Sequence, residues 1–117
     1  MIKNNHKKIY KISADLLPVD IEIIKVYMQG AVYAFCNIKK DEPFSARILF
    51  GGDNGNWNGT PMQKLYDYYI KEGKSKEEAY KSAAIDAGRL LKSLLDGDDY
   101  RTFEIVGKDT GTLYKLA

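Results

Sequence analysis

The residue types best suited to binding a small molecule are concentrated in residues 51–61, whose sequence is Gly-Gly-Asp-Asn-Gly-Asn-Trp-Asn-Gly-Thr-Pro. Glycine lets the backbone turn tightly and approach a ligand closely. Thr60 followed by Pro61 is typical of a helix start, where free amide groups and the helix dipole attract anions. We therefore expect an anion-binding site at a loop between a strand and a helix, with these contributors: Gly51, Gly52, Asp53, Asn54, Asn56, Trp57, Asn58 and Thr60.

Arginine is the second component of the expected site, because its guanidinium group binds a phosphate through two parallel hydrogen bonds. Arg47 precedes the loop, and Asp86 and Arg89 lie three residues apart among small residues of a later predicted helix. That spacing also allows a local ion pair between Asp86 and Arg89. The sequence predicts that Arg47 or Arg89 contacts the anion, with Asp86 beside it.

Aromatic side chains give the site a possible stacking surface. Trp57, the only tryptophan, either fills the core beneath the loop or offers its face to a ligand or partner. The chain has nine tyrosines, and Tyr66, Tyr68 and Tyr69 would point in three directions from one helix. Some are therefore expected at the surface, where such rings stack on bases or pack against proteins.

Neither a metal nor a cofactor is expected at the loop. Its asparagines follow the spacing of the first calcium ligands of an EF-hand, but Leu65 stands where a bidentate glutamate is needed. The loop lacks the Gly-Lys-Ser/Thr ending of a P-loop, and no βαβ unit surrounds it as in a dinucleotide-binding fold. The anion signal is therefore the generic one of glycines and free amides.

Catalysis has little support in the sequence. His6 is the only histidine and lies in the N-terminal segment, away from the loop. Cys36 has apolar neighbours and is expected to be a small buried hydrophobe. No spacing of carboxylates marks a general acid and base, so an enzyme acting through carboxylate and arginine is kept only as an alternative.

The elements that would position these residues follow from the hydrophobic pattern. The predicted strands are 21–27, 32–38, 44–50, 101–106 and 112–116, and the predicted helices are 61–72 and 76–95. The expected class is α+β: a single domain with a mainly antiparallel β-sheet in βββααββ order, packed against two helices. It would span residues 16–117, after a basic, flexible N-terminal arm at residues 1–15.

Composition limits the partners. The 117 residues carry a net charge of only +2, which makes nucleic acid an unlikely partner. No run approaches the ~20 apolar residues of a membrane span, no signal peptide is expected, and the single cysteine favours the cytoplasm. Both faces of residues 32–38 are apolar, so a sheet covered on one face would expose the other, which predicts a homodimer or larger homo-oligomer.

These observations favour a non-catalytic protein that binds or sequesters an anionic, nucleotide-like ligand. The alternatives are a protein–protein inhibitor or immunity-type module, acting on a host protein through surface aromatics, and the small carboxylate/arginine enzyme. Lysine, asparagine and tyrosine are frequent and histidine is rare. Such a composition is typical of the accessory, anti-defence proteins of phages and mobile elements with AT-rich genomes.

Overall fold

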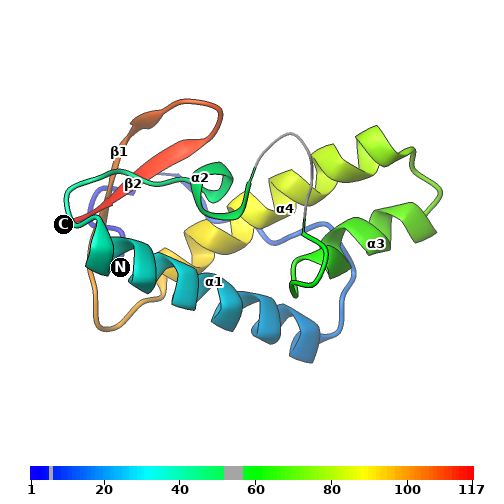
Figure 1. Ribbon diagram of the computed structural model, residues 1–117, viewed down its shortest axis with the longest axis horizontal. Coiled ribbons are helices and arrows are strands. Elements are labelled where there is room, and N and C mark those ends of the chain that lie inside the picture. Colours follow the sequence, from blue (N-terminus) through cyan, green and yellow to red (C-terminus); the bar gives the residue numbers. More distant parts are fainter. Residues whose placement is uncertain (6, 52–56) are drawn as a thin grey trace.

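The computed structural model describes residues 1–5, 7–51 and 57–117. The predictions for Gly52, Asp53, Asn54 and Asn56 therefore lie outside the described residues, as does His6. Four helices precede one β-hairpin (Figure 1). They are α1 (Pro18–Ile38), α2 (Ala46–Phe50), α3 (Gln63–Lys71), α4 (Lys76–Asp96), β1 (Phe103–Lys108) and β2 (Thr112–Leu116).

The expected βββααββ order and the mainly antiparallel sheet are wrong. Residues 21–27 and 32–38 belong to the 21-residue helix α1, and 44–50 contains the short helix α2. Within the described residues, the only sheet is the two-stranded antiparallel hairpin. Helix dominates, and the strands come last in the chain.

The pattern misled because α1 is apolar on two sides. Its buried residues are four apart, which is the period of one helical face: Ile24, Met28, Val32 and Cys36. Apolar residues also occupy the exposed face, so alternation along the sequence imitated a strand. Gln29 and Gly30 lie inside the helix and form no turn. Pro18 stands in the first turn, where its missing N–H costs no hydrogen bond.

In the second half of the chain, the structure confirms the helices and the hairpin that local sequence signals predict. Helices α3 and α4 fall within the predicted ranges to within about two residues, and the hairpin strands lie where they were expected. Ser75 caps α4 by accepting a hydrogen bond from the Glu78 amide at 3.2 Å. Gly73 follows α3 with a φ of +90°, a conformation that suits glycine at a helix end.

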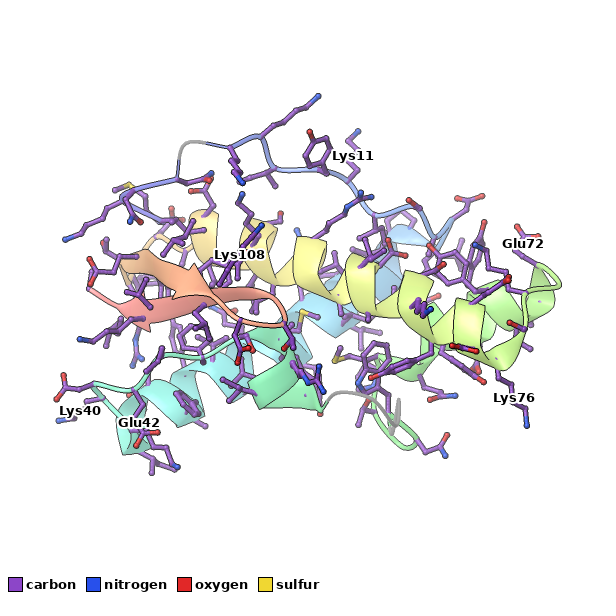
Figure 2. All side chains as sticks on the ribbon, turned by 90° about the horizontal axis from the view of Figure 1, so that it is seen from above. Lys11, Lys40, Glu42, Glu72, Lys76 and Lys108 are labelled. Carbon is purple, nitrogen blue, oxygen red and sulfur yellow. The ribbon has the colours of Figure 1, made fainter. Side chains whose placement is uncertain are left out.

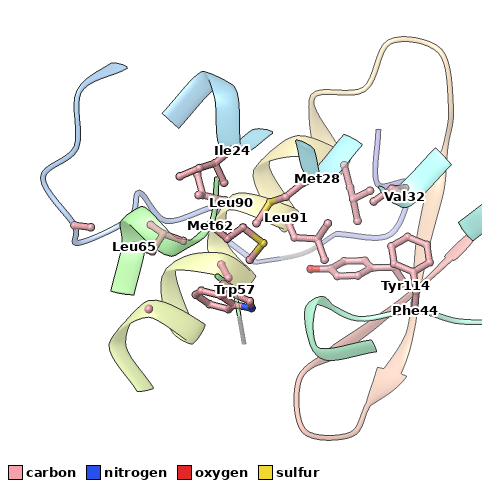
Figure 3. Close-up of a cluster of buried hydrophobic side chains, with 14 of the residues drawn as sticks. Ile24, Met28, Val32, Phe44, Trp57, Met62, Leu65, Leu90, Leu91 and Tyr114 are labelled. Carbon is pink, nitrogen blue, oxygen red and sulfur yellow. The ribbon is translucent and has the colours of Figure 1, made fainter. Parts of the chain in front are cut away.

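The helices pack around α4. Helix α3 runs back along the first half of α4, α1 crosses α4 on another side, and the hairpin lies at the far end (Figure 1). The core between them contains Met28, Met62, Leu91 and Trp57 (Figure 3). At the hairpin end, Phe44 is fully buried, with its ring against those of Phe35, Phe103 and Tyr114.

The N-terminal segment is held at two places. Its first residues pair with β1: Ile2 lies beside Phe103, and Asn4 exchanges two hydrogen bonds with the Ile105 backbone at 2.8 and 3.0 Å. Farther along, the amides of Ser13 and Ala14 donate to Asp86 on α4 at 2.9 and 3.2 Å. Residues 7–11 therefore cross α4 between two anchors, and we call them the strap.

The sequence predicts no membrane span. No helix in the described parts of the chain combines the length and apolarity needed to cross a membrane. The molecule measures 41 × 27 × 26 Å along its principal axes.

Candidate functional site: a basic groove along α4

A groove of about 680 Å³ runs along α4, a volume within the ~300–1,000 Å³ typical of ligand pockets. Helix α4 forms its floor, and the strap, α2 and the hairpin turn form its walls. Figure 2 looks onto this region, with Lys108 on the hairpin and Lys11 on the N-terminal segment marking its surroundings. Basic, aromatic and small residues are among those that line the groove: Lys7, Lys8, Tyr10, Arg47, Gly51, Trp57, Tyr80, Ala84, Gly88, Arg89, Lys92 and Lys108.

The groove combines a largely apolar lining with positive charge. Four different segments contribute lysine or arginine: Lys7 and Lys8, Arg47, Arg89 with Lys92, and Lys108. These six are a third of the chain's 18 basic residues, although the net charge is only +2. Among the groove residues that the structure describes, none is aspartate or glutamate. Basic side chains are therefore the charged residues of the described lining, and their attraction for an anion is greatest at low salt.

The floor of the groove is one stripe of α4. Tyr80, Ala84, Gly88 and Lys92 are four residues apart and so share a helical face. A Cβ atom added at Gly88 would meet no other atom of the described residues within 4 Å. Packing therefore does not demand glycine here, although glycine inside a helix costs about 1 kcal/mol relative to alanine. Its effect is to leave space in the middle of the groove.

Trp57 is a core residue that reaches the groove only at its edge. Its side chain is 3% exposed, and Nε1 donates to the Phe50 carbonyl at 2.9 Å. Figure 3 shows it beneath Met62 in the core. Its ring lies 6.1 Å from that of Tyr80, which is only half-buried. Of the predicted stacking rings, a tyrosine is therefore better placed than Trp57 to meet a base.

Four predicted site residues meet at the groove, and others do not. Arg47, Gly51, Trp57 and Arg89 line it, although Arg89 is about 40 residues from the others in sequence. Asn58 is exposed and outside it. Thr60 donates to the Trp57 carbonyl at 2.8 Å and accepts from the Met62 amide at 3.3 Å, so it organises the turn before α3. The described start of α3 does not reach the groove, which leaves out the predicted helix N-terminus.

Asp86 has a structural role in this arrangement. It is 1% exposed and accepts hydrogen bonds from the amides of Ser13 and Ala14 and, at 2.6 Å, from the Tyr69 hydroxyl. Burial and the neighbouring Asp86 raise the pKa of Tyr69, which keeps the hydroxyl protonated as a donor. Asp86 thus fixes the end of the strap to α4, instead of binding a ligand in the groove.

Arg89 has different partners from Asp86. Its Nη1 donates to the Lys11 carbonyl and to Ser13 Oγ at 3.3 and 3.4 Å, distances that mark weak bonds. Its guanidinium also lies 5.4 Å from the centre of the Tyr10 ring. These contacts hold Arg89 at the edge of the groove, where a stronger anionic acceptor can compete for its remaining N–H groups.

The predicted site residues included neither the strap nor the hairpin. Lys7, Lys8 and Tyr10 line the groove, and the run of lysines without acids in residues 3–11 was the available signal. Lys92 and Lys108 had no local signal, since each is one lysine among many. Tyr114, at the inner wall, is a buried ring whose pKa burial raises to about 12, so it stays neutral there.

The described lining of the groove presents cations suited to pairing with an anion, and lysines and tyrosines are its groups capable of proton transfer. Among the described residues that line it, none is histidine, cysteine or a carboxylate. The structure also brings together no three metal-ligating side chains of these types anywhere in residues 1–5, 7–51 and 57–117. Comparison with protein-family models, curated protein sequences and solved structures found no match for the chain.

Proposed function

We propose that this protein is a non-catalytic binding protein that holds an anionic, nucleotide-like small molecule in the groove along α4. The observation that carries the proposal is the charge of the groove: Lys7, Lys8, Arg89, Lys92 and Lys108 come from three segments and line one hollow, with no acid among its described residues. An anion bound there would be attracted by all of these charges.

Two further features support a ligand with an aromatic part. Tyr80 presents a half-buried ring on the floor, backed by Trp57, and base–aromatic stacking is worth roughly 1–3 kcal/mol. Gly88, about two helical turns from Tyr80, leaves space in the middle of the groove at a cost in helix stability that no contact in the described chain explains. Sequestration needs no catalytic group, which suits a cytoplasmic accessory protein of a phage or mobile element that removes a signalling nucleotide.

The sharpest test separates ligand binding from stability by one substitution. Gly88→Leu adds a good helix former and fills the middle of the groove. We expect it to raise the free energy of unfolding by roughly 0.5–1 kcal/mol while abolishing thermal stabilisation by a panel of linear and cyclic nucleotides. A variant that is more stable and yet no longer binds has not lost binding through unfolding, so opposite signs would identify the groove as the site.

Gly30→Leu is the matched control. Gly30 is also inside a long helix, an added Cβ there would meet no described atom within 4 Å, and it lies on α1 outside the groove. In dilute, monomeric protein this variant should gain similar stability and keep nucleotide binding. A wild-type protein that gains no stability with any nucleotide, or a Gly88→Leu variant that binds normally, would contradict the proposal.

One observation favours the alternative of a protein–protein module. The exposed face of α1 carries Val19, Ile23 and Val26, which are 60%, 49% and 61% exposed, with Gly30 and Ala34 continuing the same face. The solvent face of a surface helix normally carries charged residues, whereas here Glu22 is the exposed charge at the border of the apolar residues. A largely apolar face of this kind is a candidate contact surface for another protein.

A further inference from the structure

The two ends of the groove differ in chemistry. Tyr80, with Trp57 behind it, is at one end of the α4 stripe, and Lys92 is at the other. The twelve residues between them correspond to about 18 Å along the helix axis. Ala84 and Gly88 lie between, so neither charge nor bulk fills the middle of the stripe.

Further cations gather at the Lys92 end. Lys108 comes from the hairpin, and Thr110 and Gly111 from the following turn line the same wall. The strap passes here too: Asn4 is bonded to Ile105 on the hairpin, and the Lys11 carbonyl to Arg89. Lys7 and Lys8 lie in the chain between these two contacts, and both line the groove.

We propose that the ligand carries two or more linked phosphates and lies along α4, with its base against Tyr80 and its phosphates between Lys92 and Lys108. This inference rests on the proposed function and adds the ligand's class and orientation. A base placed on Tyr80 has to be followed by an extended anionic chain to pass Ala84 and Gly88 and reach the lysines. A single phosphate carries a charge of about −1.5 to −2 at neutral pH. The four lysines at this end, Lys7, Lys8, Lys92 and Lys108, carry more positive charge than one phosphate can neutralise.

The test compares adenosine and guanosine 5′-mono-, di- and triphosphates and inorganic tripolyphosphate by isothermal titration, at one ionic strength and without divalent cations. We expect the triphosphate to bind at least tenfold more tightly than the monophosphate, as expected for one or more added charge-assisted contacts. Lys92→Ala and Lys108→Ala should each remove most of this advantage and leave monophosphate affinity within about twofold.

Two controls locate the ends of the ligand. Lys115→Ala changes a lysine of the same hairpin that does not line the groove, and it should leave every affinity unchanged. Tyr80→Leu should weaken the nucleotides but not tripolyphosphate, because only the nucleotides have a base to stack.

The outcomes distinguish this inference from the proposed function. If mono- and triphosphates bind equally, the groove binds nucleotides but the orientation along α4 is wrong. If tripolyphosphate binds as tightly as the nucleoside triphosphate, the base contributes nothing to binding and the proposed contact between the base and Tyr80 is wrong. If none of the nucleotides binds, both the inference and the proposed function fail.

Discussion

At the scale of single residues, two aspartates connect separate segments of the chain by accepting hydrogen bonds. Asp86, on α4, accepts from the amides of Ser13 and Ala14, just after the strap, and from the Tyr69 hydroxyl on α3. Asp98 does the same where the chain leaves α4: it accepts from the Tyr100 and Arg101 amides at 2.8 and 2.9 Å and from the Tyr33 hydroxyl at 2.6 Å. Both therefore stabilise long-range contacts.

Asp98 predicts a pH dependence of stability. Partial burial by itself raises the pKa of this carboxyl, but the hydrogen bonds from Tyr33, Tyr100 and Arg101 outweigh burial and hold the pKa below its ordinary value. A depressed folded-state pKa stabilises the protein above the unfolded pKa of about 4 and loses this contribution as the pH falls through the folded-state value. Asp98→Asn should cost about 1 kcal/mol at pH 7, allowing for partial exposure.

Urea unfolding at a series of pH values checks this prediction. The stability difference between wild type and Asp98→Asn should shrink as the pH is lowered below about 4. Asp99→Asn, at the exposed neighbouring position, is the control and should follow the wild-type curve. A constant difference between wild type and Asp98→Asn at all pH values would show that the Asp98 charge contributes nothing.

At the scale of elements, α1 is the helix whose residues the sequence analysis assigned to two strands. A fully helical α1 places Gly30 in a helix interior with open space around its Cα. Gly30→Ala should therefore raise the free energy of unfolding by roughly 0.5–1 kcal/mol, because alanine loses less backbone entropy on folding.

Gly73→Ala provides a comparison of opposite sign, measured by the same denaturant unfolding of dilute protein. Gly73 has a φ of +90°, where a Cβ is strained, so alanine should destabilise by more than about 1 kcal/mol. If Gly30→Ala also destabilises, Gly30 has a conformation or a contact that a continuous α1 does not give it.

At the scale of the whole molecule, self-association cannot occur through the exposed sheet face from which the sequence analysis predicted it. The expected exposed sheet face does not exist, and Tyr33 and Phe35 are half-buried on α1. The largely apolar exposed face of α1, which includes Ile23, Val26 and Gly30, gives the homo-oligomer a new basis. We propose that a second copy covers this face across a two-fold axis, because the same patch on two identical chains closes the assembly.

Light scattering coupled to size exclusion tests this assembly. Val26→Glu places a charge at the middle of the face and should convert the protein to a monomer at micromolar concentration, with little loss of stability because the site is exposed. Val106→Glu makes the same change at an exposed position on β1 and should leave the mass unchanged. A wild-type protein that is monomeric at micromolar concentration contradicts the proposal.

Local signals in the sequence determined the local structure of the second half of the chain. The cap at Ser75, the stop at Gly73 and the turn between the last two strands act through neighbouring residues, so they predicted α3, α4 and the hairpin. Arg47, Gly51 and Arg89, which the sequence analysis selected for their capacity to bind anions, all line the groove, and their role in binding stays a prediction.

Tertiary packing decided the rest. Residues 18–38 have apolar residues on two faces, so their pattern fits both the two-residue period of a strand and the period of a helix. Which of the two forms depends on the partner that buries them. Here α4 packs against the helical face that contains Ile24, Met28 and Val32. The groove itself exists only where the strap, α2, α4 and the hairpin meet. Lys7 and Lys108 are about a hundred residues apart, and the long-range core packing that brings them to one hollow leaves no pattern in either segment alone.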